Sequence, residues 1–520
     1  MKTDLTTEQK DYARFLPALS GFYATYVGKQ RYDEYVEKSR IPSNLAHGVE
    51  SLNYLNAQEG QFQYKWSLYS AGHADLDTTK HVPKEDMVRN RDRQNTWLLG
   101  DSGGFQIGKG VWEGDWKDPN CPKAQKKRDG VLKWMDAYMD YGMILDIPAW
   151  VSRSEAGAKA TGISTYAEAV KATRINNDYW MKHRTGACKF LNVLQGENHA
   201  DADDWYEQMK DYCDPKKYPN DHFNGWSMGG QNMCDVELAL KRLVALRFDG
   251  LLEKGVHDVM HFLGTSKLEW ATLLTDIQRA VRKHHNENFT ITFDCASPFL
   301  ATANGQIYCE LETEDRTKWV YRMVPSIDDK ALAKDTTPFG QAFVREGKHT
   351  SFLDSPITTG MTAKDICIYG PGDLNKIGKE GKTSWDSFSY ALMMGHNVWM
   401  HINAVQEANR QYDAGIVPKM LIQPTFEEYG FRDVVEAIFA TDNRDTANAV
   451  IKEFSKFWTS IIGTRGATGK AATNASTYAD KHLEYVDITS EILDPEELAV
   501  WDKKKSASEP ILDNGLWEIA

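Results

Sequence analysis

Short apolar runs alternate with longer helical patterns along the chain from about residue 60. Eight of these runs have the length and the flanking glycine or polar residues that are typical of buried strands. They lie at residues 67–72, 96–101, 142–149, 189–196, 223–230, 258–265, 289–295 and 397–403. Because strands covered by helices on their outer face read as nearly continuous apolar runs, the pattern predicts an α/β protein with parallel strands.

Four of the intervening segments predict amphipathic helices. In one of them, Val236, Leu240 and Leu243 recur at helical spacing, which gives the helix one apolar face. The four predicted helices span residues 165–183, 201–212, 235–248 and 267–284.

The number of strands and the polar residues at their ends favour a closed (β/α)8 barrel of the TIM type over a doubly wound sheet. Glycine or polar residues follow nearly every apolar run. Active sites of such barrels draw on the carboxyl ends of several strands, whereas a doubly wound sheet concentrates its site at one switch point.

The 520 residues divide into three predicted parts. Residues 1–60 form an N-terminal segment packed on the barrel, and residues 61–412 form the catalytic barrel. An insertion at 310–396 precedes the last strand, because this region is too long for an ordinary barrel connection. Residues 413–520 form a C-terminal helical extension.

Composition restricts the class of protein. A net charge of −13 and a pI near 5.6 argue against a protein that coats nucleic acid without specificity, although a local basic face stays open. The seven cysteines include no CxxC pair, so neither a disulfide framework nor a zinc ribbon is indicated. Without a signal peptide or a long apolar span, we expect a cytoplasmic protein with no membrane partner.

Two aspartates stand at predicted strand ends in unusual surroundings. Asp101 opens the motif DSGGFQ, and Asp294 opens DCASPFLATANGQ. Two carboxylates from distant strands are what glycosidic-bond chemistry requires, one near the sugar and one to transfer a proton. Taken singly, each aspartate has an ordinary alternative, since Asp294 could cap a helix or lie in a turn and the glycines after Asp101 could hold a phosphate.

Together the two motifs resemble the tRNA-guanine transglycosylase family. The resemblance covers about residues 60–310, with an echo at 395–410. It implies that Asp294 is the nucleophile, which forms a covalent bond with the sugar as the base departs. It also implies that Asp101 is the general acid/base, and that Ser102 and Phe105 lie against the exchanged base.

Further strand ends match the positions with which this family recognises its base. The resemblance implies that Asp146 accepts hydrogen bonds from the donor edge of guanine, which suits a carboxylate. It implies that Gln195 and Gly196 contact the base carbonyl. The remaining implied contacts are Gly225 and Trp226, beside the substituent at position 7 of the base, and His261 and Leu263, on the opposite wall.

Two departures from the family pattern bear on the substrate. Gly230 stands where bacterial members carry an acidic residue, which favours a base with a neutral substituent, most simply 7-cyano-7-deazaguanine. The three closely spaced cysteines of tRNA-acting members are missing, because Cys309 and Cys367 stand far apart, so we expect no structural zinc. The pattern is most like the transglycosylases of bacteria and phages that place 7-deazaguanine in DNA, which implies the host cytoplasm if the chain is phage-encoded.

A duplex target adds a requirement, because the guanine must be extruded at a cost of roughly a few kcal/mol. Candidate DNA contacts are Arg89, Arg91, Arg93 and Lys109, which flank Asp101 in sequence. The expected partners are DNA with an extruded guanine and the free 7-deazaguanine base, with a homodimer or a helper protein left open. No cofactor is expected, since GTRGATGK at 463–470 lacks the spacing and the Ser/Thr of an ATP-binding loop.

Three alternatives stay open. The same base exchange could act on tRNA, although the missing cysteines argue against it. The chain could be a non-catalytic partner subunit of such an enzyme, although it retains both Asp101 and Asp294. An unrelated barrel glycosidase would explain the two carboxylates but not the guanine-reading residues.

Overall fold

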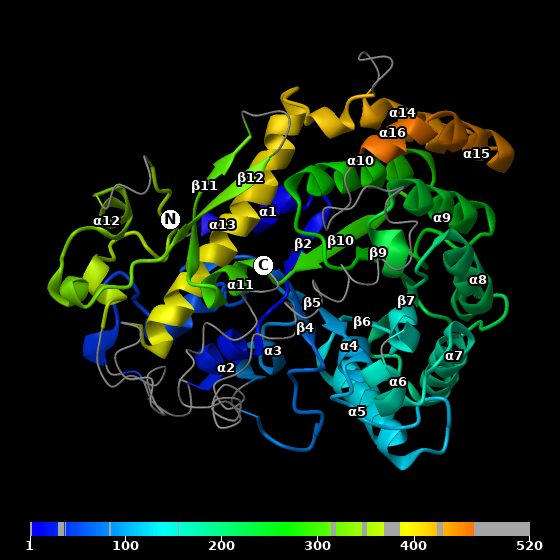
Figure 1. Cartoon of the computed structure of the whole chain (residues 1–520), viewed down its shortest axis with the longest axis horizontal. Coiled ribbons are helices and arrows are strands. Elements are labelled where there is room, and N and C mark those ends of the chain that lie inside the picture. The colour runs from blue at the N-terminus through cyan, green and yellow to red at the C-terminus, as the bar shows by residue number, and fades with distance from the viewer. Residues whose placement is uncertain are drawn as a thin grey trace.

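Eight parallel strands surrounded by helices form a (β/α)8 barrel in the computed structural model of the chain (Figure 1). The structure describes residues 3–29, 36, 38–82, 85–153, 155–313, 319–345, 351–368, 385–423 and 430–461. The barrel strands are β2 (Arg14–Pro17), β4 (Trp66–Ser70), β5 (Trp97–Asp101), β6 (Tyr141–Met143), β7 (Lys189–Leu194), β8 (Gly225–Met228), β9 (Val259–Phe262) and β10 (Thr290–Cys295).

Each barrel strand pairs in parallel with the next one along the chain, from β4 to β10. Strand β2 then pairs with β10, with Asp294 opposite Leu16. The ring closes between β2 and β4 through a parallel bridge that joins Ala18 and Leu68. All eight strands therefore present their carboxyl ends at one mouth of the barrel.

Helices follow the strands in the order expected of this fold. The four predicted amphipathic helices are present as α7 (Tyr166–His183), α8 (His199–Met209), α9 (Val236–Phe248) and α10 (Leu268–His284). Three of them begin at side-chain caps, Thr165, Asn198 and Asp235, which satisfy amides of the first turn. The other helices after the barrel strands are α2 (Gly21–Lys29), α3 (Asp86–Arg89), α4 (Gly104–Gly108), α5 (Pro122–Tyr138), α6 (Glu155–Thr161), α11 (Ser297–Ala303) and α13 (Ser387–Asp413).

The predicted eighth strand is wrong. Residues 397–403 lie inside α13, a helix of 27 residues, and the true remaining strand is β2, which comes first in the chain. The run in α13 reads as a strand because the helix is buried on most sides, and periodicity cannot then separate the two structures. The barrel therefore begins before residue 61, within the segment that was expected only to pack on it.

The long segment after β10 is not an insertion before a last strand. It follows the last strand and precedes the last barrel helix, α13. Its described part contains the antiparallel hairpin of β11 (Gln306–Glu312) and β12 (Val320–Pro325), together with α12 (Phe339–Arg345). The hairpin lies along α13 (Figure 1), and the Tyr321 hydroxyl is hydrogen-bonded to His401 Nε2 at 3.0 Å. The sequence DICIYG at 365–370 is a further apolar run within the predicted insertion. Asp365 ends a short 3-10 helix that begins at Ala363, and residues 366–368, the rest of the described part, are not in a strand.

Within the described residues, three helices follow the barrel, and they pack on its outer side. They are α14 (Phe431–Ala440), α15 (Arg444–Glu453) and α16 (Ser455–Ser460), which lie beside α9 and α10 (Figure 1). Arg432 of α14 forms an ion pair with the buried Asp276 of α10 at 2.9 Å. The rest of the expected C-terminal extension, including residues 463–470, lies outside the described residues.

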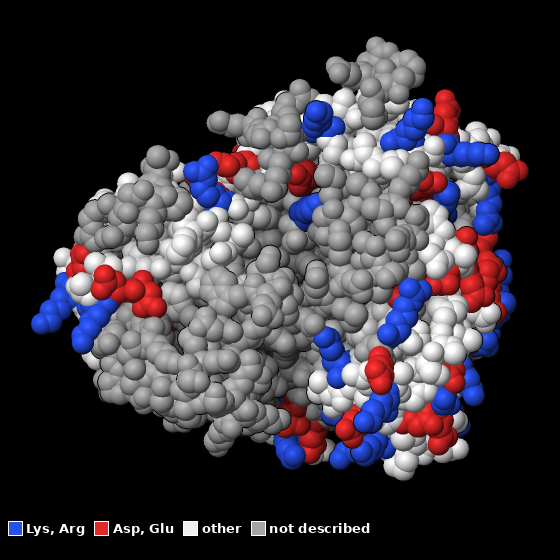
Figure 2. Space-filling view, viewed as in Figure 1, with Lys and Arg blue, Asp and Glu red and all other residues white. Residues whose placement is uncertain are grey.

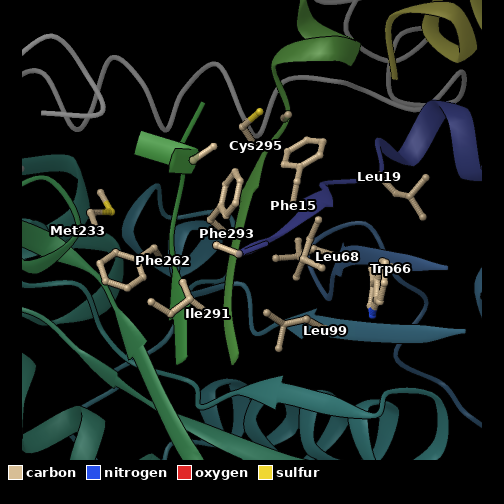
Figure 3. Close-up of a cluster of buried hydrophobic side chains, with 14 of the residues drawn as sticks. Phe15, Leu19, Trp66, Leu68, Leu99, Met233, Phe262, Ile291, Phe293 and Cys295 are labelled. Carbon is tan, nitrogen blue, oxygen red and sulfur yellow. The ribbon is translucent and has the colours of Figure 1, made fainter. Parts of the chain in front are cut away.

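The alternation of side chains along β10 separates the hydrophobic core from the site. Ile291, Phe293 and Cys295 are buried apolar residues in the cluster of Figure 3, where Phe293 lies next to Phe15 of β2. Since neighbouring side chains of a strand point to opposite faces, Thr292 and Asp294 point the other way, into the barrel.

No described helix has both the length and the apolar character needed to cross a lipid bilayer.

Candidate active site

Asp101 lies at the carboxyl end of β5 and is bound by its neighbour on β4. The hydroxyl of Ser70 donates to Asp101 Oδ2 at 2.6 Å. Burial raises the pKa of the Asp101 carboxyl, the hydrogen bond from Ser70 lowers it, and the negative charge of Asp294 raises it further. The two aspartates, which lie in distant motifs of the sequence, are therefore close enough for the charge of Asp294 to raise the pKa of Asp101.

Asp294 lies at the carboxyl end of β10 and is nearly buried, with 11% of its side chain exposed. Its Oδ1 atom is 3.1 Å from His261 Nε2 and accepts a hydrogen bond from the Gly264 N–H at 2.9 Å. His261 comes from β9, and Gly264 from the loop that follows it. Two neighbouring strands thus fix the orientation of this carboxylate.

Asp146 and Gln195 form a buried polar pair after β6 and β7. The side-chain amide of Gln195 donates to Asp146 Oδ2 at 2.8 Å. Burial raises the pKa of the Asp146 carboxyl to about 7, with the charge of Asp101 adding to the effect and Gln195 opposing it. Side chains of α7 support the loop, because Thr173 accepts from the Ile147 N–H and Asn176 donates to the Leu145 carbonyl.

Glycines let the surrounding backbone approach this pair. A Cβ atom at Gly104 would lie 2.8 Å from the carbonyl oxygen of Asp146. A Cβ at Gly230 would lie 2.4 Å from the carbonyl oxygen of Gly196, and Gly230 has a φ of +54°. Both distances are shorter than van der Waals contact, so no side chain fits at these positions without movement. The glycines in DSGGFQ and in the motif after β8 are therefore needed for close packing around the carboxylates.

The remaining residues of DSGGFQ lie at the rim of the same mouth. Ser102 is buried next to Asp101. Phe105, on α4, is partly buried 6.1 Å from Trp150, measured between ring centroids. The ammonium group of Lys109 lies 5.6 Å from the Phe105 ring centroid, so this lysine does stand near the candidate site.

Two residues expected to contact the base do not face the mouth. Gly225 is the first residue of β8 and thus lies at the amino end of that strand. The Trp226 side chain points outward, where its indole N–H donates to the carbonyl of Leu251 at 2.8 Å and the ring packs beside Tyr206. The assignment of Gly225 and Trp226 is wrong because the motif begins at the wrong end of the strand. Gly229 and Gly230, at its other end, approach Gln195 instead.

The three arginines before β5 are not placed to contact a nucleic acid at the mouth. Arg91 is buried and forms an ion pair with Asp140 at 2.5 Å, just before β6 begins. Arg89 pairs with Glu85 and has only 5% of its side chain exposed. Arg93 donates to the carbonyls of Ala137 and Met139. The contacts of Arg91 and Arg93 lie at the amino end of the barrel. These arginines come just before β5 begins, whereas Asp101 is its last residue, so they are close in sequence but lie at opposite ends of the strand.

Several site residues were missed by sequence reasoning. Ser70 is the last residue of β4 and His73 follows the apolar run at 67–72, and each lowers the pKa of Asp101. Glu197 follows Gln195 and forms an ion pair with Arg153 at 2.5 Å, while burial raises the pKa of Glu197 to about 7. Polar residues just after a predicted barrel strand were the available signal for all of them.

The residues near the missing zinc motif have other partners. Cys309 and Cys367 contact the carbonyls of Arg322 and Ile327, and His396 lies 2.7 Å from the carbonyl of Tyr308. Within the described ranges, no group of three or more His, Cys, Asp or Glu side chains could hold a metal ion. The absence of zinc remains a prediction.

The arrangement combines three chemical elements at one mouth. Asp294 is oriented by its neighbours, Asp101 has a raised pKa that favours proton transfer, and Asp146 with Gln195 offers acceptor and donor atoms to a planar ligand. Comparison with protein-family models and with curated proteins gives no match to this chain. The geometry of the mouth and the sequence motifs therefore carry the functional argument.

Proposed function

We propose that the protein is a guanine transglycosylase, which exchanges a guanine of DNA for a free 7-deazaguanine base. The observation that carries this proposal is the meeting of Asp101 and Asp294 at the barrel mouth, beside the buried pair of Asp146 and Gln195. Two carboxylates supply the chemistry at the sugar, and the buried pair supplies recognition of a base. A barrel glycosidase would need only the first of these.

The reaction is a double displacement at the anomeric carbon. Asp294 attacks C1′, the bond from C1′ to N9 of guanine breaks, and its electron pair leaves with the base. Asp101 in its protonated form gives its proton to the departing guanine. The incoming base then returns a proton to Asp101 as its N9 attacks C1′, and the Asp294 carboxylate is released. No cofactor is consumed in this sequence of steps.

The protonation of Asp101 suits its proposed role. Burial and the nearby negative charge of Asp294 both raise the pKa of this carboxyl, so it holds a proton at a higher pH than an exposed aspartate does. When Asp294 becomes an ester with the sugar, it loses its charge. The pKa of Asp101 then falls, which favours transfer of the proton to the base.

Recognition of guanine is assigned to Asp146 and Gln195. A carboxylate can accept from both the N1–H and the exocyclic amine of guanine, and adenine offers no such pair of donors on that edge. Asp146 Oδ2 is already held by the amide of Gln195 at 2.8 Å. That contact fixes the plane of the carboxylate before a base arrives, which lowers the entropy cost of binding.

A neutral substituent on the incoming base is favoured by the backbone after β8. Gly230 has a φ of +54°, and a Cβ there would lie 2.4 Å from the Gly196 carbonyl oxygen. No acidic side chain can project from this position without backbone movement, so nothing at this position counters a cationic aminomethyl group. We therefore assign 7-cyano-7-deazaguanine as the incoming base. A binding preference for the aminomethyl analogue would contradict this assignment.

The departures from the family's sequence pattern favour DNA over tRNA. Because the net charge of the chain is −13, attraction of the polyanion has to come from another source. On the face shown in Figure 2, lysine and arginine side chains are interspersed with aspartate and glutamate, and the described residues there form no single basic patch. Affinity for a polyanion depends on such positive charge. A helper protein or a second copy of the chain would supply it.

The deciding experiment is base exchange with radiolabelled guanine, with double-stranded DNA and tRNA tested in parallel. We expect label to enter DNA with the native protein and not with Asp294→Ala, because that variant lacks the attacking oxygen. An Asp140→Asn variant, changed at the other end of the barrel, is the control for nonspecific effects of removing a carboxylate.

Each other result has a definite meaning. Label that enters only tRNA would transfer the activity to the alternative polymer. Label in neither polymer, with protein shown to be folded by its circular dichroism, would favour the non-catalytic partner subunit. Label that enters DNA equally well with Asp294→Ala would contradict the assigned nucleophile.

A further inference from the structure

The carboxylate of Asp294 is hydrogen-bonded on one side only. Its Oδ1 atom is bound by His261 and by the N–H of Gly264, at 3.1 and 2.9 Å. Its Oδ2 atom accepts no hydrogen bond from any residue that the structure describes. The two oxygens, which are equivalent in a free carboxylate, are therefore unequal here.

His261 is itself held by Thr292, two residues before Asp294 on the same strand. Thr292 Oγ1 lies 2.9 Å from His261 Nδ1, and both side chains are fully buried. A carboxylate can only accept, so Nε2 carries the hydrogen toward Asp294. In the neutral ring Nδ1 is then the acceptor, and the hydroxyl of Thr292 donates to it.

We propose that His261 is a positioning residue, which holds Oδ1 of Asp294 so that Oδ2 is the oxygen that attacks C1′. This inference rests on the proposed function, and it replaces the expectation that His261 forms a wall of the base site. Both ring nitrogens of His261 already have partners, so the ring offers no polar edge to a base. The residue acts through Asp294.

The bond between Oδ2 and C1′ forms while the bond between C1′ and N9 breaks, and the electron pair leaves with N9 and takes the proton of Asp101. Oδ1 becomes the carbonyl oxygen of the resulting ester, and it keeps its hydrogen bonds from His261 and Gly264. Attack by the incoming base reverses these changes. A carboxylate free to rotate would spend less time in the attacking geometry.

The test uses three variants of the full chain and measures kcat and KM for the incoming base on DNA. His261→Leu removes the donor, and we expect kcat to fall about 10- to 100-fold, as for the loss of one hydrogen bond to a charged group. KM should change little, because the base does not contact this ring. His261→Gln places an amide N–H near the position of Nε2, and it should recover most of the lost kcat.

Thr292→Val provides a variant of nearly the same shape as the native residue. It removes the hydroxyl that orients the ring, and we expect a loss of kcat of about 3- to 10-fold with KM unchanged. This variant decides the matter if His261→Leu fails to fold, which denaturation in urea would reveal.

Several results would overturn the inference. They are a kcat for His261→Leu within about twofold of the native value, a raised KM with unchanged kcat, or a His261→Gln variant no better than His261→Leu. In each case the native protein still exchanges guanine, so the proposed function stands while the inference fails. A native protein that exchanges no base in either polymer overturns both.

Discussion

Asp140, at the amino end of the barrel, and Asp101 and Asp146, at its carboxyl end, are held by different kinds of partner. At the amino end, Asp140 accepts from the Arg91 guanidinium at 2.5 Å and from the Leu98 N–H at 2.8 Å. At the carboxyl end, the described side chains that donate to Asp101 and Asp146 are neutral, Ser70 at 2.6 Å and Gln195 at 2.8 Å. Among the described residues, neither forms an ion pair with a lysine or an arginine.

This difference separates stability from function within one fold. Where a carboxylate is paired with a buried guanidinium, loss of either partner leaves the other charge without compensation and destabilises the native state. A buried carboxylate without a cation instead has a raised pKa and is costly to ionise, and such groups collect at functional sites. The amino end is thus organised for stability, and the carboxyl end holds groups that can exchange protons or bind a ligand.

The largest expected effect comes from Asp101→Asn. The change removes the proton donor and keeps the shape of the side chain, so we expect kcat for base exchange to fall by about 10²- to 10⁴-fold. The free energy of unfolding, measured in urea, should stay the same or rise, because a carboxyl that is costly to ionise has been removed. An Asn variant with native activity would show that Asp101 transfers no proton.

The next effect is a pH-dependent change in stability from Asp146→Asn. The pKa of Asp146 is raised to about 7 by burial, so from about pH 4 to pH 7 the folded protein binds a proton that the unfolded chain releases. The contribution of this group to stability therefore falls as the pH rises through that range. We expect Asp146→Asn to raise the free energy of unfolding by roughly 2 to 4 kcal/mol at pH 8 and hardly at all at pH 4.

Urea denaturation at several pH values checks this expectation. The same variant should lose affinity for guanine, because an amide cannot accept two hydrogen bonds on one edge without presenting its NH₂ group. Glu197→Gln is a matched comparison for the stability measurement alone, since burial also raises the pKa of Glu197 to about 7. A stability difference that does not depend on pH would show that Asp146 is ionised throughout.

At the amino end the expected change affects stability and leaves the chemistry alone. Arg91→Leu leaves Asp140 without its cation, so we expect a loss of about 1 to 3 kcal/mol in the free energy of unfolding. The kcat of the folded variant should stay native. Arg93→Leu is the control, because Arg93 is an exposed residue whose guanidinium donates to the carbonyls of Ala137 and Met139. If Arg91→Leu weakened binding to DNA and left stability unchanged, the assignment of this end would be wrong.

Much of the barrel could be predicted from sequence, because seven of its strands are apolar runs with polar ends and three of the four predicted helices have side-chain caps. Strand β2 was missed because its residues, Arg14–Pro17, include an arginine and a proline that weaken the strand pattern. Pro17 is the last residue of the strand and lies opposite Cys295 of β10. The stretch at 397–403 was misread because burial on most sides removes the helical period.

Site residues could be predicted where they stand at the carboxyl end of a strand, because this position places them at the mouth of the barrel. Asp101, Asp146 and Asp294 belong to this group. The prediction that Trp226 contacts the base was wrong because one step along a strand reverses the face of a side chain. The prediction that Arg91 contacts DNA was wrong because closeness to Asp101 in sequence does not show at which end of the barrel a residue lies. The role of His261 needed its two neighbours, Thr292 and Asp294, which only the fold brings together.

The smallest expected effect compares two glycines with left-handed backbones at opposite ends of the barrel. Gly230, at the mouth, has a φ of +54° and a Cβ there would lie 2.4 Å from the Gly196 carbonyl oxygen, whereas Gly250 has a φ of +73° and nothing within 4 Å. Both alanine variants suffer the same backbone strain, about 1 kcal/mol. Only Gly230→Ala also forces the backbone beside Gln195 to move, so its free energy of unfolding should fall by a further 1 kcal/mol or so.

The functional difference between these two variants should exceed the difference in stability. Displacement of Gly196 and Gln195 disturbs the partner of Asp146, so Gly230→Ala should raise KM for the incoming base while Gly250→Ala leaves it unchanged. Urea denaturation and exchange kinetics on the two proteins give the comparison directly. If Gly230→Ala and Gly250→Ala lost equally in stability and in KM, the backbone after β8 would have space for a Cβ atom. Gly230 would then not exclude an acidic side chain from the base site.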